Sequence, residues 1–311
     1  MTAIEVSGLS KSYDGVLAND DLTFTVETGE VFGYLGPNGA GKSTTIRTLL
    51  GFQSPTAGSA TVLGHDVREP RELRRAKAHI GYLPGEPAFD GSVTGEEFLD
   101  YQAALKGDSR RDELLDLFTP PLEKRIREYS TGNKQMLGIV QAFMHDPDLL
   151  IMDEPTSGLD PLKQAAFNRF VRDERDAGKT VFFSSHILGE VRRVCDRVGI
   201  IRDGRLVTVE DVDTLLERGG KRVHLHTAEP LDERDLALDG VVSFEQVDRE
   251  VRFTFAGDYN DLLAALSDHV VVDLEIEEPP IEEVFMHFYG ETDAESEGST
   301  PSDEPGGPRD V

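Results

Sequence analysis

The sequence predicts an α/β protein that contains an all-helical insert and is followed by a small α+β domain. Three observations lead to this fold class. Short apolar runs alternate with helical patterns over the first 220 residues, the segment from about residue 94 to residue 145 has no strand-like run, and the pattern changes again near Gly219-Gly220. We therefore expect one domain at residues 1–216, a second at residues 217–290 and a tail at residues 291–311.

The beginning of the chain predicts an antiparallel β subdomain. Three strand-like runs follow one another: Ile4–Ser7, Leu17–Asn19 and Leu22–Val26. We expect turns after the first run and on either side of the other two, at residues typical of turns. These turn residues are Gly8, Asp14-Gly15 and Thr28-Gly29.

The α/β core follows from the alternation of strand and helix patterns. Short continuous apolar runs are typical of buried strands, and we expect several of these strands to be parallel. The five runs are Val31–Leu35, Ile80–Leu83, Leu149–Met152, Thr180–Ser184 and Val198–Ile201. The helical patterns between them are Lys42–Leu50, Glu72–Ala78, Leu162–Asp176 and Leu188–Val194.

The insert at about residues 94–145 is predicted to be entirely helical. Thr94 and Glu97 have the spacing of a capping box, which starts a helix that runs to about Leu105. A second helix spans about Arg110–Phe118, and Pro120-Pro121 then breaks the pattern.

The C-terminal third predicts a small α+β domain, of βαββαβ type. Its strand-like runs are Val223–Thr227, Val241–Gln246, Val251–Phe255 and Val270–Leu274, and its helical patterns are Asp258–Leu266 and Pro280–Tyr289. Residues 291–311 hold seven acidic residues and one arginine. We expect this segment to be disordered, because it has too little apolar surface to bury.

The charge of the chain argues against two kinds of partner, nucleic acid and anionic lipid. It has 32 basic and 59 acidic residues, a formal net charge of −27, whereas contact with nucleic acid or anionic lipid needs a basic face. We expect no nucleic-acid partner. Only nine of the basic residues are lysine. An acidic, lysine-poor surface stays hydrated in concentrated salt, so the composition indicates either a salt-loving source or an ordinary acidic protein.

Cysteine content and hydropathy bear on the compartment. Cys195 is the single cysteine and can form no internal disulfide, which fits a reducing compartment. The N-terminus has neither a basic run nor an apolar stretch, and no run of about 18 apolar residues occurs. We expect no signal peptide and no membrane span, so a membrane role would require a partner.

Residues 36–43 match the phosphate-binding pattern G-x-x-x-x-G-K-[ST] between a predicted strand and a predicted helix. Glycines let backbone N–H groups approach phosphate oxygens without Cβ clashes, and the helix N-terminus favours an anion. Lys42 is expected to contact the β- and γ-phosphates, and the Ser43 hydroxyl to bind Mg²⁺.

A second motif is the apolar run Leu149–Met152, which ends in Asp153 and Glu154 and resembles a Walker B motif. Asp153 can hold Mg²⁺ directly or through water. Glu154 can accept a proton from the attacking water or orient that water. Taken alone, the pair has a plainer interpretation as two solvent-facing acids at a strand end.

With these motifs, residues 2–216 resemble the ATP-binding subunits of ABC transporters. Tyr13 stands where the family has an aromatic that stacks on adenine. Residues 157–160 stand in the place of the family's D-loop, and His186 in that of its switch histidine. Residues 129–135, Tyr-Ser-Thr-Gly-Asn-Lys-Gln, stand where the family has its signature segment. Without this context, Tyr13 and His186 have structural interpretations, and Asp160 is a good helix N-cap.

The resemblance implies ATP and Mg²⁺ as cofactors and a dimer that sandwiches two ATP molecules head to tail. Glu154, His186 and Lys42 are the catalytic candidates, and Ser43 and Asp153 the metal ligands. Ser130 and Gly132 would serve the ATP of the other subunit. The expected nucleotide-binding residues are Tyr13, Gly36, Pro37, Asn38, Gly39, Ala40, Gly41, Lys42, Ser43, Thr44, Ser130, Gly132 and Asp160.

The chain departs from the family pattern in two places. Thr131 and Asn133 replace a glycine and a glutamine of the signature segment. Gly85 stands where the family usually has a glutamine that reaches Mg²⁺ and contacts the membrane partner. Either Glu86 or water would have to replace that side chain.

The resemblance implies a function that the motifs alone do not reach. The C-terminal domain, the helical insert and residues 281–290 resemble the ATPases of ABC-2 type exporters. We therefore expect an ATPase subunit that drives a separate ABC-2 type permease and pairs with a second copy of itself or a homologous subunit. It would be cytoplasmic and peripheral on the inner face of the membrane. The alternatives are a soluble ABC-type ATPase switch without a permease and a non-hydrolytic scaffold.

Overall fold

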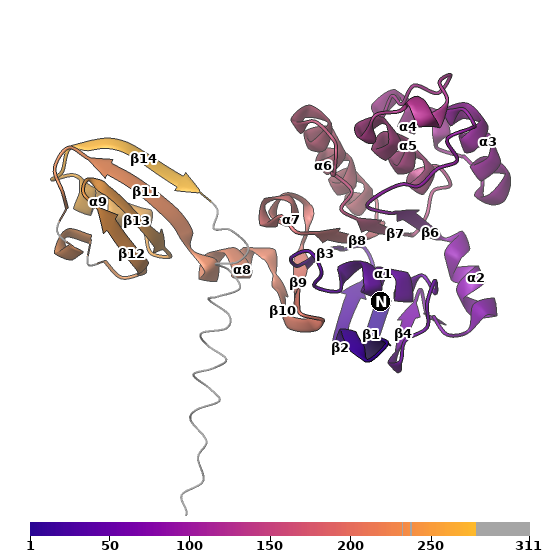
Figure 1. Cartoon of the computed structure of the whole chain (residues 1–311), viewed down its shortest axis with the longest axis horizontal. Helices are drawn as coiled ribbons and strands as arrows, with labels where there is room; N and C mark the ends of the chain where they lie inside the picture. The colour runs from indigo at the N-terminus through magenta and orange to yellow at the C-terminus, as the bar shows by residue number, and fades with distance from the viewer. Residues whose placement is uncertain (232, 237, 278–311) are drawn as a thin grey trace, which may run out of the picture. The chain divides into compact units, whose positions relative to one another are not determined.

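The computed structural model describes residues 1–231, 233–236 and 238–277 (Figure 1). The chain divides into two compact units, Met1–Leu215 and Leu216–Val311, and each is described by itself. The helix expected at Pro280–Tyr289 and the tail expected at residues 291–311 lie outside the described residues.

The first unit begins with a four-stranded antiparallel sheet in the order β2-β1-β4-β5. Its strands are β1 (Thr2–Tyr13), β2 (Val16–Glu27), β4 (Ala57–Val62) and β5 (His65–Asp66). The turn predicted at Gly8 is wrong. Gly8 has φ 59° and lies in an irregular part of β1, where the register shifts between Val6 and Leu9, so the strand bends there and continues. The two runs expected at 17–26 likewise form one strand.

A six-stranded sheet forms the centre of the first unit, in the order β10-β9-β3-β8-β7-β6 (Figure 1). All its pairs are parallel except that of β9 and β10, which confirms the predicted α/β class. The strands are β3 (Val31–Leu35), β6 (Ile80–Leu83), β7 (Leu149–Asp153), β8 (Thr180–Ser185), β9 (Arg197–Arg202) and β10 (Arg205–Asp211). The strands β4, β5 and β10 were not predicted from the sequence.

Helices connect the parallel strands. They are α1 (Lys42–Leu49), α2 (Pro70–Ala78), α6 (Pro161–Asp176) and α7 (Leu188–Val194). The helix α8 (Val212–Gly219) follows β10. The insert holds α3 (Gly95–Lys106), α4 (Arg111–Leu117), a 3-10 turn (Ile126–Glu128) and α5 (Thr131–Phe143). The predicted capping box starts α3: Glu97 N donates to Thr94 Oγ1 at 3.2 Å, and Thr94 N donates to Glu97 Oε2 at 2.8 Å. Among the described residues, no helix is both long and apolar enough to cross a membrane.

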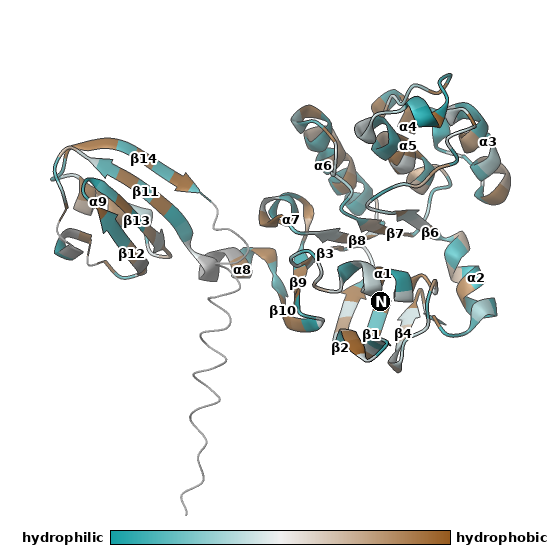
Figure 2. Ribbon diagram, in the orientation of Figure 1, coloured by the Kyte–Doolittle hydropathy of each residue, from teal (hydrophilic) through white to brown (hydrophobic). Residues whose placement is uncertain are grey.

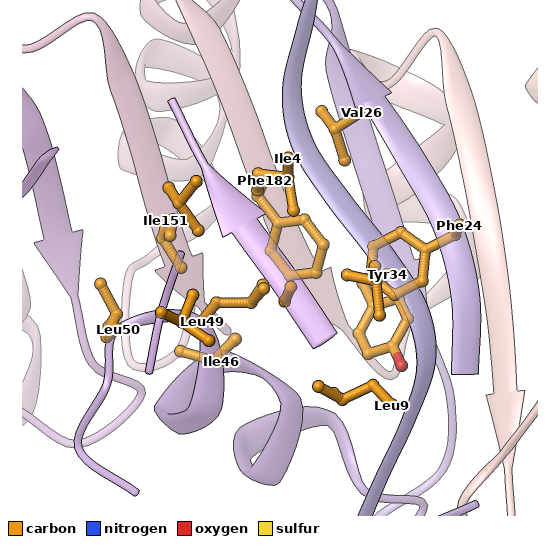
Figure 3. Packing of buried hydrophobic residues seen from close by; sticks show 14 of the residues in the cluster. Ile4, Leu9, Phe24, Val26, Tyr34, Ile46, Leu49, Leu50, Ile151 and Phe182 are labelled. Atoms are coloured by element: carbon orange, nitrogen blue, oxygen red, sulfur yellow. The ribbon is translucent and has the colours of Figure 1, made fainter. Parts of the chain in front are cut away.

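The hydrophobic core of the first unit packs against the two elements that the phosphate loop joins. Figure 3 shows Ile46 and Leu49 of α1 beside Phe182 of β8 and Tyr34 of β3. The Tyr34 and Phe182 ring centroids are 5.2 Å apart, and all four side chains are fully buried. Each buried side chain of this size contributes roughly 1.5–3 kcal/mol. The end of β3 and the start of α1 are therefore anchored on both sides of the loop that joins them.

The second unit contains a four-stranded antiparallel sheet in the order β12-β13-β11-β14. Its elements are β11 (Lys221–Thr227), β12 (Val241–Val247), β13 (Glu250–Phe255), α9 (Tyr259–Leu266) and β14 (Val271–Glu277). Apolar and polar residues alternate along β11 and β13, visible as brown and teal in Figure 2, so each strand buries one face.

The strand order is that of a βαββαβ unit, but one predicted element is replaced. Between β11 and β12 the described residues form a 3-10 turn, Glu233–Leu236, instead of an α-helix. Leu231 and Leu236 of this connection are nevertheless buried in the core. The stretch from Pro230 to Gly240 is short and rich in Asp, which disfavours a longer helix.

Candidate active site

The phosphate loop joins β3 to α1 through a backbone that requires glycine. Gly39 and Gly41 have φ 84° and 107°. A Cβ on Gly36 would lie 2.3 Å from Ile201 O, and one on Gly41 would lie 2.5 Å from Ala18 O. Larger residues would therefore push the loop away from its neighbours. Of the other loop residues, Ala40 is buried and Asn38 is exposed, whereas Pro37 and Thr44 are partly buried.

Lys42 holds its side chain inside this loop. Its Nζ donates to Gly36 O at 2.6 Å and to Pro37 O at 3.1 Å, and lies 3.7 Å from Glu154 Oε1. Burial lowers the pKa of the Lys42 ammonium, and the nearby Glu154 and Asp153 carboxylates partly oppose this. A nearly buried cation thus faces backbone carbonyls and carboxylates, which a phosphate can replace.

Asp153, at the end of β7, accepts hydrogen bonds from two serine hydroxyls. Ser43 Oγ donates to Oδ2 at 2.8 Å, and Ser184 Oγ donates to Oδ1. Ser184 is the cross-strand partner of Asp153 on β8 and was not among the predicted site residues. The Ser43 hydroxyl and the Asp153 carboxylate form a small set of hard oxygen donors beside the phosphate loop. This set fits Mg²⁺, which keeps several waters and phosphate oxygens as ligands.

Glu154 lies between Lys42 and His186. Its Oε1 is 3.1 Å from His186 Nδ1, and its backbone has φ 48°, a left-handed conformation that is uncommon for glutamate. The backbone N–H still donates to Ser184 O at 3.0 Å. The chain therefore turns directly after β7, and the carboxylate lies beside the Lys42 cation, where it can accept a proton from water.

Tyr13 lies at the end of β1 and is 43% exposed. Its hydroxyl donates to Gln53 Oε1, and Gln53 Nε2 donates to Thr44 O at 2.9 Å. Lys11 Nζ lies 5.1 Å from the ring centroid. The ring is thus tied to α1 through Gln53 and has exposed surface on which a base can stack. No sequence pattern singles out Gln53.

The signature segment and the D-loop contact each other. Ser130 caps α5, since its Oγ accepts from Asn133 N at 3.3 Å. A Cβ on Gly132 would lie 2.6 Å from Gly158 O, which explains why glycine is needed at position 132. Asp160 caps α6 by accepting from Lys163 N at 3.0 Å. Within the described residues, no hydrogen bond or ion pair joins Ser130, Gly132 or Asp160 to the phosphate loop or to Glu154.

Gly85 lies against the same strand end as the acidic pair. A Cβ at this position would lie 3.2 Å from Asp153 O, and the neighbouring Glu86 is exposed. The backbone at Gly85 therefore lies against Asp153, and no side chain of residue 85 stands between them. Six residues thus lie close together at this end of the sheet: Lys42, Ser43, Gly85, Asp153, Glu154 and His186.

Comparisons with known proteins agree with this arrangement. Residues 19–157 match the model of the family described as ABC transporter. The chain is 34% identical over 299 residues to the Nod factor export ATP-binding protein I of Rhizobium johnstonii, covering 93% of this chain and 95% of that protein. It is 38% identical over 221 residues to an uncharacterized ABC transporter ATP-binding protein, YhcH, of Bacillus subtilis, covering 68% and 70%. A solved structure of an ATP-binding subunit of an ABC transporter matches with a TM-score of 0.64 at 32% identity, covering 69% of this chain and 92% of that one.

Proposed function

Because the chain belongs to the family of ABC transporter ATP-binding subunits and is therefore an ATPase, we propose that it powers export through a separate ABC-2 type permease. The observation that carries the ATPase part of the proposal is the cluster around Glu154, whose carboxylate lies 3.7 Å from the Lys42 ammonium and 3.1 Å from the His186 imidazole. A matching relative is named as an export subunit, which supports the direction of transport.

The geometry supports distinct roles for the clustered residues. Lys42 contacts the β- and γ-phosphates of ATP, and His186 contacts the γ-phosphate. Ser43 and Asp153 would hold Mg²⁺, which supplies positive charge to the phosphates. Glu154 accepts the proton of the attacking water or orients that water. Tyr13 offers its ring to the adenine. All these side chains lie in the first unit.

We propose that hydrolysis needs a second subunit. Ser130 and Gly132 lie at the N-terminus of α5, a site that favours an anion, and within the described residues neither contacts its own phosphate loop. Gly158 of the D-loop lies against Gly132, and Asp160 follows it two residues later. A second copy, or a homologous subunit, that approaches head to tail would present its ATP to these groups and receive the same in return.

The permease would dock in an apolar groove of the first unit, of about 370 Å³. Aromatic side chains line it, from α3 and from the loops and strands that flank it: Phe52, Tyr82, Phe89 and Phe98. Lys77 and Lys106 also line it, and burial lowers the pKa of both ammonium groups. A short helix of the permease with an apolar face and a carboxylate matches these walls.

The groove connects physically to the acidic pair. Pro84 and Ala88 line it, and Gly85 between them lies against Asp153. Movement of a helix in the groove would therefore reach the end of β7 through one short loop. On this proposal the subunit is cytoplasmic and peripheral on the inner face of the membrane, held there by the permease. The acidic composition further suggests that it works in concentrated salt.

Purification of the tagged chain from gently solubilised membranes tests the partner. We expect a polytopic membrane protein in stoichiometric amount, and Phe98→Ser in the groove should abolish its recovery while ATP hydrolysis persists. Leu162→Ser is the control, because Leu162 is 84% exposed and outside the groove. Recovery of the wild-type chain alone or with ribosomes would instead favour the soluble switch.

Glu154→Gln tests the chemistry separately. The amide keeps the size of the side chain but cannot take a proton, so we expect kcat to fall roughly 10²–10⁴-fold. The variant should accumulate as an ATP-bound dimer, which gel filtration with ATP would detect. Hydrolysis at the wild-type rate would exclude the assigned role of Glu154.

A further inference from the structure

The two loops that bear Glu154 and His186 share a single acceptor, the Glu190 carboxylate of α7. Thr156 Oγ1, two residues after Glu154, donates to Glu190 Oε1. Ser185 Oγ, directly before His186, donates to Glu190 Oε2 at 2.6 Å. We call Thr156, Ser185 and Glu190 the Glu190 clasp.

The two hydroxyl-bearing residues of the clasp are shielded from water, whereas Glu190 is partly buried. Thr156 is 2% exposed and Ser185 is 1% exposed. A buried hydroxyl needs an acceptor, because water cannot replace a lost partner there. Both hydroxyls donate to an acidic side chain, and hydrogen bonds to an ionised acceptor are stronger than those between neutral groups. Ser185 Oγ also accepts from Ile187 N at 3.0 Å, which fixes the other side of His186.

The loop after Glu154 is held from a second direction. Gln135 of α5, 1% exposed, donates from Nε2 to Pro155 O at 2.8 Å. Pro155 and Thr156 are thus bound to α5 on one side and to Glu190 on the other. The 3.1 Å contact between Glu154 and His186 lies between these attachments.

We propose that Glu190 is a positioning residue for ATP hydrolysis, which holds Glu154 and His186 at their mutual distance without touching the nucleotide. The inference rests on the roles proposed for Glu154 and His186. Loss of the carboxylate would release Thr156 and Ser185 together, so both loops would relax. A displacement of about 1 Å at reacting groups can cost on the order of 10²-fold in rate.

Steady-state ATPase kinetics of Glu190→Ala and Glu190→Gln test the proposal. We expect kcat of Glu190→Ala to fall about 10–10²-fold, with KM for ATP within about threefold, because the contacts of the phosphate loop do not involve the clasp. Glu190→Gln should keep at least about a third of the wild-type kcat, since an amide can still bond both hydroxyls when they reorient.

Glu174→Ala is the control for a general loss of stability. Glu174 is 5% exposed and accepts two hydrogen bonds of 2.6 Å from Arg110, which belongs to neither loop. We expect this variant to lose thermal stability yet keep its kcat. A wild-type kcat in Glu190→Ala, or an equal loss in Glu174→Ala, would overturn the positioning role. Glu154→Gln, assayed alongside, shows separately whether the role of Glu154 itself fails.

Discussion

The helical insert is joined to the core partly through His145, and this contact predicts a loss of stability in mild acid. His145 Nε2 lies 3.2 Å from Ile80 O, the first carbonyl of β6. Burial lowers the pKa of the imidazole to about 4, and the nearby Lys106 ammonium adds to the effect. The neutral ring that donates to Ile80 O is therefore the form that the fold prefers.

The sign and size of this loss of stability follow from the different proton uptake of His145 in the folded and unfolded chain. The unfolded chain takes up a proton on His145 below a pH of about 6.5, whereas the folded chain resists protonation until about pH 4. Stability is therefore lost as the pH falls through this window. Between pH 7.5 and pH 5.0 this one group should reduce the free energy of unfolding by about 2 kcal/mol.

Urea unfolding of wild type and His145→Gln at pH 7.5, 6.0 and 5.0 measures this difference. The variant should lose about 2 kcal/mol less than wild type over the range, whatever the other groups contribute. His65→Gln is the control, since His65 lies on β5 and is not among the groups that shift the pKa of the His145 imidazole. Parallel curves for wild type and His145→Gln would refute the reasoning.

Three further predictions concern the site and the charge. ATP affinity should weaken as the pH rises through the Lys42 pKa, which burial lowers below its ordinary value; nucleotide titration from pH 7 to pH 10 measures this, and a flat profile would contradict it. Gly132→Ala should lower ATPase activity and cost about 1–3 kcal/mol of stability by overpacking, because its Cβ would lie 2.6 Å from Gly158 O; Gly189→Ala, with open space at its Cβ, should change neither. The free energy of unfolding should rise from 0.1 M to 1 M KCl, because the electrostatic screening length shortens from about 10 Å to about 3 Å and the repulsion within a chain of net charge −27 weakens. An unchanged free energy of unfolding would exclude a destabilising effect of this charge.

The parts of the fold that depend on residues close together in the sequence were predictable. The phosphate loop, the acidic pair and the strands around them have local patterns: apolar runs, glycine spacing and a lysine at one position. The Thr94–Glu97 capping box was equally readable, because both of its hydrogen bonds are made within one turn.

Errors arose where distant segments decide the structure. Gly8 looked like a turn, but a Cβ on Gly58 of β4 would lie 2.1 Å from Gly8 O. The two glycines permit this close approach of β1 and β4, which no window of one segment reveals. The strand β10 was missed because it is only half buried and pairs antiparallel on the edge of a parallel sheet.

The candidate site shows the same division. Lys42, Ser43, Asp153, Glu154 and His186 could be proposed from motifs, and the structure places them together. Gln53 and Ser184 were not found, because their relevance depends on contacts with Tyr13 and Asp153. No rule of sequence spacing predicts such partners, because only the fold brings them within hydrogen-bonding distance.

The left-handed backbone of Glu154 sets stability against activity at one position. A left-handed conformation costs a residue with a side chain roughly 1–2 kcal/mol, and glycine or asparagine accepts it more readily. Selection for thermal tolerance alone would therefore favour changing position 154, and each such change would delete the carboxylate that faces Lys42. On the role proposed for Glu154, the easiest gains in folding stability at this residue remove ATPase activity, so directed evolution of a more stable variant should screen for turnover in every round.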